Sequence, residues 1–207
     1  PVQRRQMTTV DAPNVHNVAV EGTFDDCQDL VKALFADEAM RDEFGFGAVN
    51  SINWARVMVQ IAYYFHAALA LGGPDRPVAF AVPMGNFGNI YAGLAAGRMG
   101  LPIPRLVVGS NRNDILTRYF REGRMEMAGV TPTLSPSMDI QVSSNFERFL
   151  FDLYGGDGAA LSEAMIAFRR DGRLDPGAER WRAATEIFEG HRFDDEETVA
   201  AIGRLYR

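Results

Sequence analysis

Residues 78–100 constrain the possible fold more than any other part of the chain. Val78–Val82 is a short apolar run that predicts a buried strand. The loop PMGNFGN follows at 83–89, and Ile90–Met99 has the pattern of an alanine-rich helix that stops at Gly100. A strand, a glycine loop and a helix in this order direct free backbone N–H groups toward an anion. The segment predicts a phosphate-binding loop, with a plain tight turn as the alternative.

The elements around this segment predict the fold class. Leu106–Val108 indicates a second buried strand, and Asn113–Glu122 indicates a helix. A long helix is predicted over about 51–71, and a further helix over 145–154. Strands that alternate with helices favour parallel pairing through crossover helices. We therefore expect an α/β fold with an open, mostly parallel sheet flanked by helices, and ligands at the carboxyl ends of its strands.

The two ends of the chain have weaker patterns. Residues 15–20 (VHNVAV) predict a strand. Thr23 and Asp26 resemble a capping box, which predicts a helix that runs through Phe35. Residues 155–207 are charged and helical in pattern, without a strand signal, so we expect two or three peripheral helices there.

Composition excludes several classes of protein. The net charge of −6 and the pI of about 5.1 disfavour a nucleic-acid partner, which would require a basic surface. Cys27 is the single cysteine, so no internal disulfide can form, and the chain fits a reducing compartment. His16, His66 and His191 lack the spacing of metal ligands. Without a long apolar span or a signal peptide, we expect a soluble cytoplasmic protein with no membrane partner.

Two segments have residues suited to phosphate. The loop around Gly85 and Gly88 is neither GxxxxGK[ST] nor GxGxxG, so it matches no common nucleotide motif. In NSINWAR at 50–56, Asn50 or Ser51 can cap the long helix, and Arg56 lies on its early turns. An ordinary N-cap with a surface arginine is the alternative there. Together the two segments suggest a phosphorylated cofactor beside a phosphorylated substrate.

Several stretches resemble threonine synthases, which are pyridoxal phosphate enzymes of the tryptophan-synthase β fold. The stretches occur in the order found in that family and cover roughly residues 1–154. They are VEGTFDDCQ at 20–28, NSINWAR at 50–56, GNFGN at 85–89, MGLPI at 99–103, NRNDIL at 111–116 and TLSPSMDI at 133–140. Each stretch alone is weak, but the combination is specific.

The resemblance implies roles for both phosphate segments. The residues whose backbone would hold the 5′-phosphate of pyridoxal phosphate are Gly85, Asn86, Phe87, Gly88 and Asn89. The residues that would grip the substrate phosphate are Asn50, Ser51 and Arg56. The implied substrate is O-phosphohomoserine, which loses phosphate and gains water to give threonine. The cofactor would supply the electron sink, and the protein would supply orientation and proton transfer.

One departure from the family concerns lysine. The chemistry needs a lysine that forms a Schiff base with the cofactor, in an F-K-D motif. Lys32 is the one lysine of this chain, and it lies on an ordinary helix face without that motif. We therefore expect no catalytic residue in this chain, no covalent cofactor attachment and no activity of the chain alone. It resembles an internal fragment that lacks both ends of a threonine synthase.

The resemblance also suggests a division of the chain. Residues 1–49 would be the tail of a smaller substrate domain, 50–154 the core of the pyridoxal-phosphate domain, and 155–207 a peripheral helical segment. Apolar surface left bare by truncation would favour self-association.

Two alternatives remain at this point. Another lyase of the same fold, a dehydratase or a cysteine synthase, would share the glycine loop but would not need the cluster of Asn50, Ser51 and Arg56. A non-catalytic module that binds a phosphorylated metabolite would need no lysine.

Overall fold

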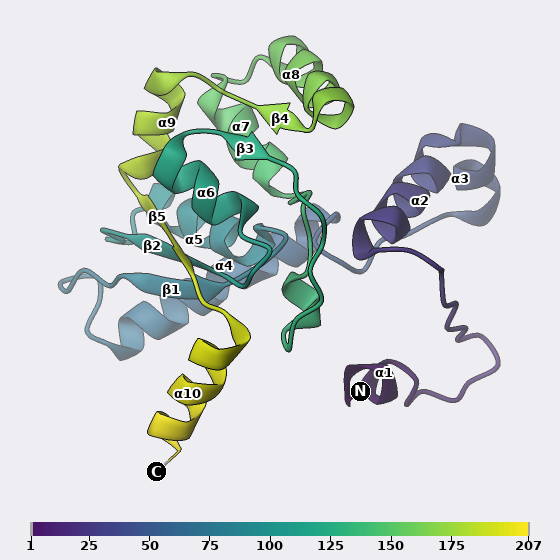
Figure 1. Cartoon of the computed structure of the whole chain (residues 1–207), viewed down its shortest axis with the longest axis horizontal. Coiled ribbons are helices and arrows are strands. Elements are labelled where there is room, and N and C mark those ends of the chain that lie inside the picture. The colour runs from purple at the N-terminus through teal and green to yellow at the C-terminus, as the bar shows by residue number, and fades with distance from the viewer. Residues whose placement is uncertain (1, 207) are drawn as a thin grey trace.

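The structure is a computed structural model that describes residues 2–206. Figure 1 labels its elements along the chain. The helices are α1 (Val2–Met7), α2 (Phe24–Ala36), α3 (Glu38–Phe44), α4 (Trp54–Ala70), α5 (Gly88–Arg98), α6 (Ile115–Glu122), α7 (Phe146–Leu153), α8 (Gly158–Asp171), α9 (Ala178–Thr185) and α10 (Asp195–Leu205). The strands are β1 (Phe80–Pro83), β2 (Leu106–Ser110), β3 (Met125–Glu126), β4 (Arg173–Leu174) and β5 (Phe188–Arg192).

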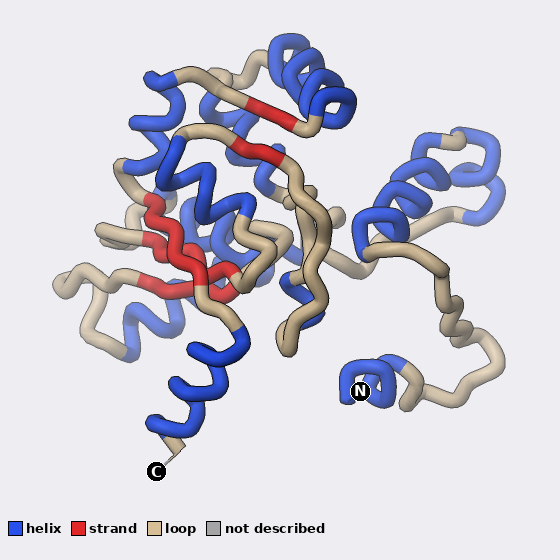
Figure 2. Tube along the Cα trace, viewed as in Figure 1, coloured by secondary structure: helices blue, strands red, loops and turns tan. Residues whose placement is uncertain are grey.

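A parallel sheet forms the centre of the molecule. Its strand order is β1-β2-β5, with Phe80 beside Leu106 and Leu106 beside Phe188. Both pairings are parallel, which confirms the predicted α/β class. Figure 2 shows the three strands side by side, with helices before and after them in the chain. A short antiparallel pair, β3 and β4, lies outside this sheet.

One face of the sheet carries the core. The Phe80 ring contacts Tyr64 of α4 at a centroid distance of 4.8 Å. Phe188 contacts Phe120 of α6 at 5.3 Å and Phe149 of α7 at 4.9 Å. Because parallel partners in register point to the same face, α4, α6 and α7 all cover this one side. Burial of these rings away from water is the main source of stability in this part of the chain.

The N-terminal helices lie apart from the sheet (Figure 1). The predicted capping box at the start of α2 is confirmed: the Thr23 hydroxyl accepts from the Asp26 amide, and the Asp26 carboxylate accepts from the Thr23 amide. Among residues 4–53, Gln28 is the only buried side chain. The hydrogen bonds of the capping box therefore contribute more to the formation of α2 than side-chain burial does.

Two sequence-based expectations are wrong. Residues 15–20 form no strand; they are exposed and have no neighbouring strand to satisfy their backbone groups. Residues 155–207 are not wholly helical, since Phe188–Arg192 is the third strand of the parallel sheet. Only Phe188 and Gly190 are buried in that strand, and the polar residues Glu189, His191 and Arg192 weaken its apolar signal.

No helix within residues 2–206 is both long enough and apolar enough to cross a membrane.

Candidate functional site: an amide-lined loop at the end of strand β1

The backbone between β1 and α5 has unused donors. The Met84 amide donates to the Gly109 carbonyl at 2.9 Å, and the Tyr91 amide donates to the Phe87 carbonyl at 3.0 Å. Between them, no amide N–H of Gly85–Ile90 donates to any group of residues 2–206. Amides left unpaired in a partly buried loop cost free energy unless a ligand or water accepts from them. The loop therefore presents a row of donors at a helix N-terminus, where an anion is favoured.

Phe87 sets the shape of this loop. Its φ of 62° lies in the left-handed region, which a side chain other than glycine rarely adopts. Its ring is fully buried and contacts Phe146 at 5.0 Å and Phe188 at 5.2 Å. This burial compensates the backbone strain, which typically costs about 1–3 kcal/mol. Phe87 also begins α5 without any side-chain cap, so the first amides of the helix stay available.

The two glycines of the loop are closely enclosed. A Cβ atom on Gly85 would lie 3.0 Å from the Ile140 side chain, and one on Gly88 would lie 2.9 Å from Ser51 Cβ. Any larger residue would push these neighbours away from the loop. The contact at Gly88 also shows that the two phosphate-suited segments predicted from the sequence adjoin each other in space.

Asn86 joins the loop to two other parts of the chain. Its Oδ1 accepts from Gln28 Nε2 at 3.1 Å and from the Ser144 hydroxyl at 3.4 Å. Its carbonyl accepts from the Asn145 amide at 3.1 Å. Gln28 and Asn145 were given no role from the sequence, because a buried polar residue has no distinctive local pattern. Gln28 had only contributed to the family resemblance, as the last residue of VEGTFDDCQ, and Asn145 had only marked the start of a predicted helix.

Asn89 is fixed by α4. The Tyr64 hydroxyl donates to Asn89 Oδ1 at 2.8 Å and to the Asn89 carbonyl at 3.0 Å. Burial raises the pKa of Tyr64 well above its ordinary value, so the phenol stays protonated and remains a donor. The side-chain oxygen of Asn89 therefore accepts from Tyr64.

The segment that encloses Gly85 is fixed by a partly buried polar cluster. Asp139 Oδ1 accepts from Asn111 Nδ2 at 2.7 Å, from Asn113 Nδ2 at 3.0 Å and from the Thr133 hydroxyl at 2.7 Å. These bonds tie the 133–140 segment to the end of β2. Within that segment, they position Ile140 beside Gly85.

The predicted substrate-phosphate residues are only partly brought together. Ser51 accepts from Asn145 Nδ2 at 2.9 Å beside Gly88. Asn50 is exposed, and its Oδ1 accepts from the Ile52 amide at 3.0 Å. Neither caps α4: Asn53 does so by accepting from the Ala55 amide at 3.0 Å. Arg56 is exposed on the first turn of α4 and makes no ion pair or hydrogen bond with residues 2–206 through its side chain.

Comparison with known proteins gives a consistent set of relatives. Residues 1–170 match the family of pyridoxal-phosphate dependent enzymes. The threonine synthase of Pseudomonas aeruginosa is 54% identical over 206 residues, which are 100% of this chain and 44% of that protein. The threonine synthase of Saccharomyces cerevisiae is 43% identical over 218 residues, with 100% of this chain and 42% of that protein covered.

Solved structures give the same result. The pyridoxal-phosphate-bound threonine synthase of Brucella melitensis superposes with a TM-score of 0.87 at 50% identity, covering 99% of this chain and 44% of that one. The yeast threonine synthase gives a TM-score of 0.83 at 41% identity, covering 100% and 42%. The chain thus spans less than half the length of these relatives.

Proposed function

Because this chain belongs to the family of pyridoxal-phosphate dependent enzymes, we propose that its Gly85–Asn89 loop binds the 5′-phosphate of that cofactor in a threonine synthase. The unpaired amides of the loop are the observation that carries the proposal. The loop fits the group: its donors suit phosphate oxygens, and residues 83–91 contain no acidic side chain that would repel them. When bound, the cofactor supplies an electron sink for carbanion chemistry.

The role proposed for the chain's own residues is to bind the phosphate and to orient the cofactor. Amides at the start of α5 meet the phosphate dianion, and the helix dipole adds to the attraction. Phe87 and the Tyr64–Asn89 bonds keep these amides in place before the ligand arrives. Such preorganisation lowers the free-energy cost of binding.

For the substrate, we propose O-phosphohomoserine, which loses its phosphate and gains water at the β-carbon to give threonine. The proposed phosphate ligands are Asn50, Ser51 and Arg56, of which Ser51 adjoins the cofactor loop. The guanidinium of Arg56 is available because it pairs with no carboxylate of residues 2–206. A hydrogen bond from a charged donor of this kind typically contributes about 1.5–3 kcal/mol.

We further propose that the 207-residue chain alone turns over no substrate. Lys32 is its one lysine, and it lies on α2 rather than in the loop. The expected cytoplasmic location and the division at residues 49 and 154 stay predictions.

A chimera tests the proposed function. The 206-residue matching stretch of the Pseudomonas aeruginosa threonine synthase is replaced by this chain. We expect the chimera to release phosphate from O-phosphohomoserine and to support growth without threonine. Arg56→Ala should lower kcat/KM about tenfold to a hundredfold through loss of a charge-assisted bond, with cofactor absorbance unchanged. Arg41→Ala, at another exposed arginine, is the matched control.

The same chimera separates the alternatives. A folded chimera that binds the cofactor but deaminates serine or threonine, and leaves O-phosphohomoserine intact, would support another lyase of this fold. One that binds phosphorylated metabolites without turning any over would support a binding module. Either result would contradict the threonine synthase proposal.

We also propose that isolated copies of the chain associate. A groove of about 590 Å³ runs between the ends of β1 and β2 and helix α10, and its lining is mostly apolar. Ile202 and Leu205 of α10 line it while remaining exposed. A second copy would cover this apolar surface. Sedimentation velocity should show concentration-dependent dimers that Ile202→Glu abolishes; a monomer at every concentration would contradict this.

A further inference from the structure

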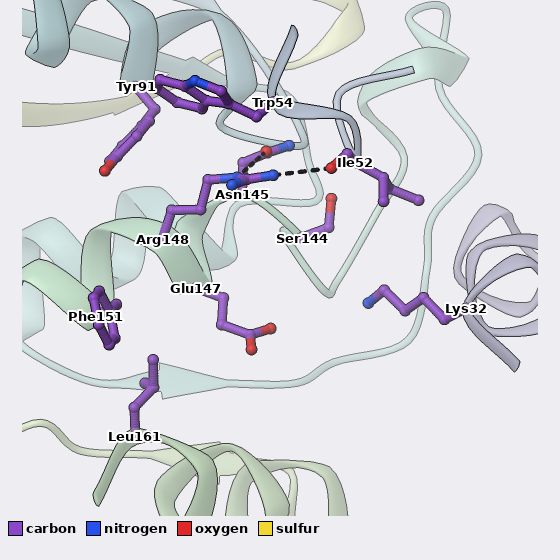
Figure 3. A pocket seen from close by; sticks show the side chains of 10 residues that line it. All are labelled: Lys32, Ile52, Trp54, Tyr91, Ser144, Asn145, Glu147, Arg148, Phe151 and Leu161. Atoms are coloured by element: carbon purple, nitrogen blue, oxygen red, sulfur yellow. Dashed lines mark hydrogen bonds between the residues drawn. The ribbon is translucent and has the colours of Figure 1, made fainter. Parts of the chain in front are cut away.

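We infer that a second cavity, beside the cofactor loop, binds a free α-amino acid with an apolar side chain. The cavity has a volume of about 460 Å³ and lies among α2, residues 52–54 and helices α5, α7 and α8 (Figure 3). This size suits a small ligand. The site goes beyond the proposed function, because none of the residues assigned to the cofactor or to O-phosphohomoserine lines it.

Two opposite charges in the cavity lack partners. Lys32 extends from α2 and Glu147 from α7, and both side chains are half-buried. In Figure 3 the Lys32 ammonium and the Glu147 carboxylate reach into the same space. Neither forms an ion pair or a side-chain hydrogen bond with any of residues 2–206. A partly desolvated charge without a counter-charge is unfavourable, so a ligand with both charges gains free energy from each.

The presence of both charges in one cavity favours a zwitterion. Lys32 and Glu147 do not pair with each other, although they line one cavity. An α-amino acid carries a carboxylate for the first and an ammonium for the second. A simple anion would meet Lys32 but would be repelled by Glu147.

Arg148 does not serve as a second free cation. Its Nε donates to Asn145 Oδ1 at 3.1 Å, and its Nη2 donates to the Ile52 carbonyl at 2.9 Å. Its guanidinium also lies 5.7 Å from the centre of the Trp54 ring. These contacts fix Arg148 as part of the wall, so Lys32 remains the cation that can move to a ligand.

The opposite wall is apolar. Phe151 of α7 and Leu161 of α8 lie across the cavity from Lys32 in Figure 3. A branched aliphatic side chain placed against them would bury its methyl groups, at about 0.8 kcal/mol for each CH₂ removed from water. Leucine therefore combines the two charges with an apolar side chain suited to this wall.

The cavity also connects to the cofactor loop. Ser144 and Asn145 line it, and both bond to Asn86, at 3.4 Å through the Ser144 hydroxyl and at 3.1 Å through the Asn145 amide. An amino acid bound there would touch the residues that hold the phosphate loop. An amino acid bound in the cavity would therefore act on the loop through these two bonds.

The single lysine allows a residue-specific test on the 207-residue chain. Protein labelled with ¹³C-lysine gives one ε-methylene NMR signal, that of Lys32. We expect L-leucine to shift this signal saturably, whereas 4-methylpentanoate and 3-methylbutylamine, which each lack one charge, shift it far less. By calorimetry, Lys32→Met and Glu147→Gln should each weaken leucine binding at least about tenfold, the effect of losing one charge-assisted bond. Glu163→Gln, at an exposed site on α8, is the control.

Three results would overturn the inference. Inorganic phosphate could shift the Lys32 signal while leucine does not, which would indicate an anion site. Leucine binding could be unchanged in both variants, which would place it elsewhere. The third such result is that none of the probes shifts the Lys32 signal, which would mean that the cavity binds none of them. None of these measurements uses pyridoxal phosphate or O-phosphohomoserine, so their outcome is independent of the proposed function.

Discussion

Residues 4–53 and residues 57–188 are held in place by different forces. In the first region Gln28 is the only buried side chain, and it is polar. The second region contains the buried apolar side chains, from Val57 to Phe188. Helices form in both, but only the second has a core that removes large rings from water. Secondary structure can therefore form without the burial that fixes its position.

The N-terminal helices are attached to the rest of the molecule mainly by polar contacts. The Asp25 carboxylate accepts from the amides of Gln141 at 3.2 Å and Val142 at 3.3 Å. Gln28 bonds to Asn86 at 3.1 Å. Each such bond contributes about 0.5–1.5 kcal/mol. We therefore expect α2 to detach from the loop at a lower free-energy cost than unfolding of the sheet region.

The largest expected effect contrasts two phenylalanines. Phe146 is 1% exposed within the aromatic cluster, and Phe44 on α3 is 62% exposed. Phe146→Ala should cost about 3–5 kcal/mol, because it leaves a cavity among packed rings. Phe44→Ala should cost less than about 1 kcal/mol. Urea unfolding monitored by circular dichroism measures both; equal costs would remove the distinction between the two regions.

The next contrast concerns glycines. A Cβ on Gly93 of α5 would lie 2.6 Å from Tyr64 Cε1, whereas one on Gly97 of the same helix, or on Gly47 near α3, would have no neighbour within 4 Å. Gly93→Ala should destabilise by about 1–3 kcal/mol through overpacking. Gly97→Ala should stabilise by about 0.5–1 kcal/mol, because alanine favours a helix. Thermal melts of the two variants check this, and a neutral Gly93→Ala would show that α4 and α5 pack loosely.

The capping box gives a smaller and more local effect. Thr23→Ala removes the side chain that accepts from the Asp26 amide. The loss should be about 1 kcal/mol and confined to α2, because few buried contacts link α2 to the core. Hydrogen exchange should accelerate in α2 and stay unchanged in α5. Faster exchange in both helices would mean that the two regions unfold as one unit.

The smallest effect is a dependence on pH. Burial raises the pKa of Asp25, chiefly through desolvation. The folded state then keeps the proton over a pH interval in which the unfolded chain has lost it, so docking of α2 weakens as pH rises through that interval. Asp25→Asn should remove this slope in hydrogen exchange of α2 as pH rises above 3.8, the ordinary pKa of the carboxyl.

Asp26 provides the control of opposite sign. Hydrogen bonds from the Thr23 amide and hydroxyl lower the pKa of Asp26, so its contribution is present at neutral pH and is lost as pH falls through that lowered pKa. Asp26→Asn should therefore weaken α2 at neutral pH and leave the Asp25 slope in place. If the pH slope remains in Asp25→Asn, the slope belongs to another titrating group.

The sheet core was predictable because its signals are local. Val78–Val82 and Leu106–Val108 are apolar runs, and the glycine loop between strand and helix is visible in the sequence. Strand β5 was missed because two buried positions in five residues give too weak a pattern. Residues 15–20 had a strand pattern but no partner strand, which only the folded structure reveals.

The loop backbone of the candidate site could be predicted from the sequence, but the side chains that hold the loop in place could not. The Gly85–Asn89 loop follows from the order of strand, glycines and helix. Gln28, Asn145 and Asp139 act through bonds to residues far away in the sequence, such as the 2.9 Å bond between Asn145 and Ser51. Spacing cannot show such contacts. Arg56 lies on the first turn of α4, as expected, and is exposed there, as the alternative of a surface arginine predicted.

The most direct test of the central claim is amide NMR of the loop. Pyridoxine 5′-phosphate serves as the ligand, since it carries the phosphate ester but no aldehyde that could react with Lys32. We expect the ¹⁵N–¹H signals of Gly85–Ile90 to shift together on titration, and Gly88→Ala to abolish the shifts, because its Cβ would lie 2.9 Å from Ser51 Cβ. Signals that stay unchanged while other residues respond would contradict a phosphate site in this loop.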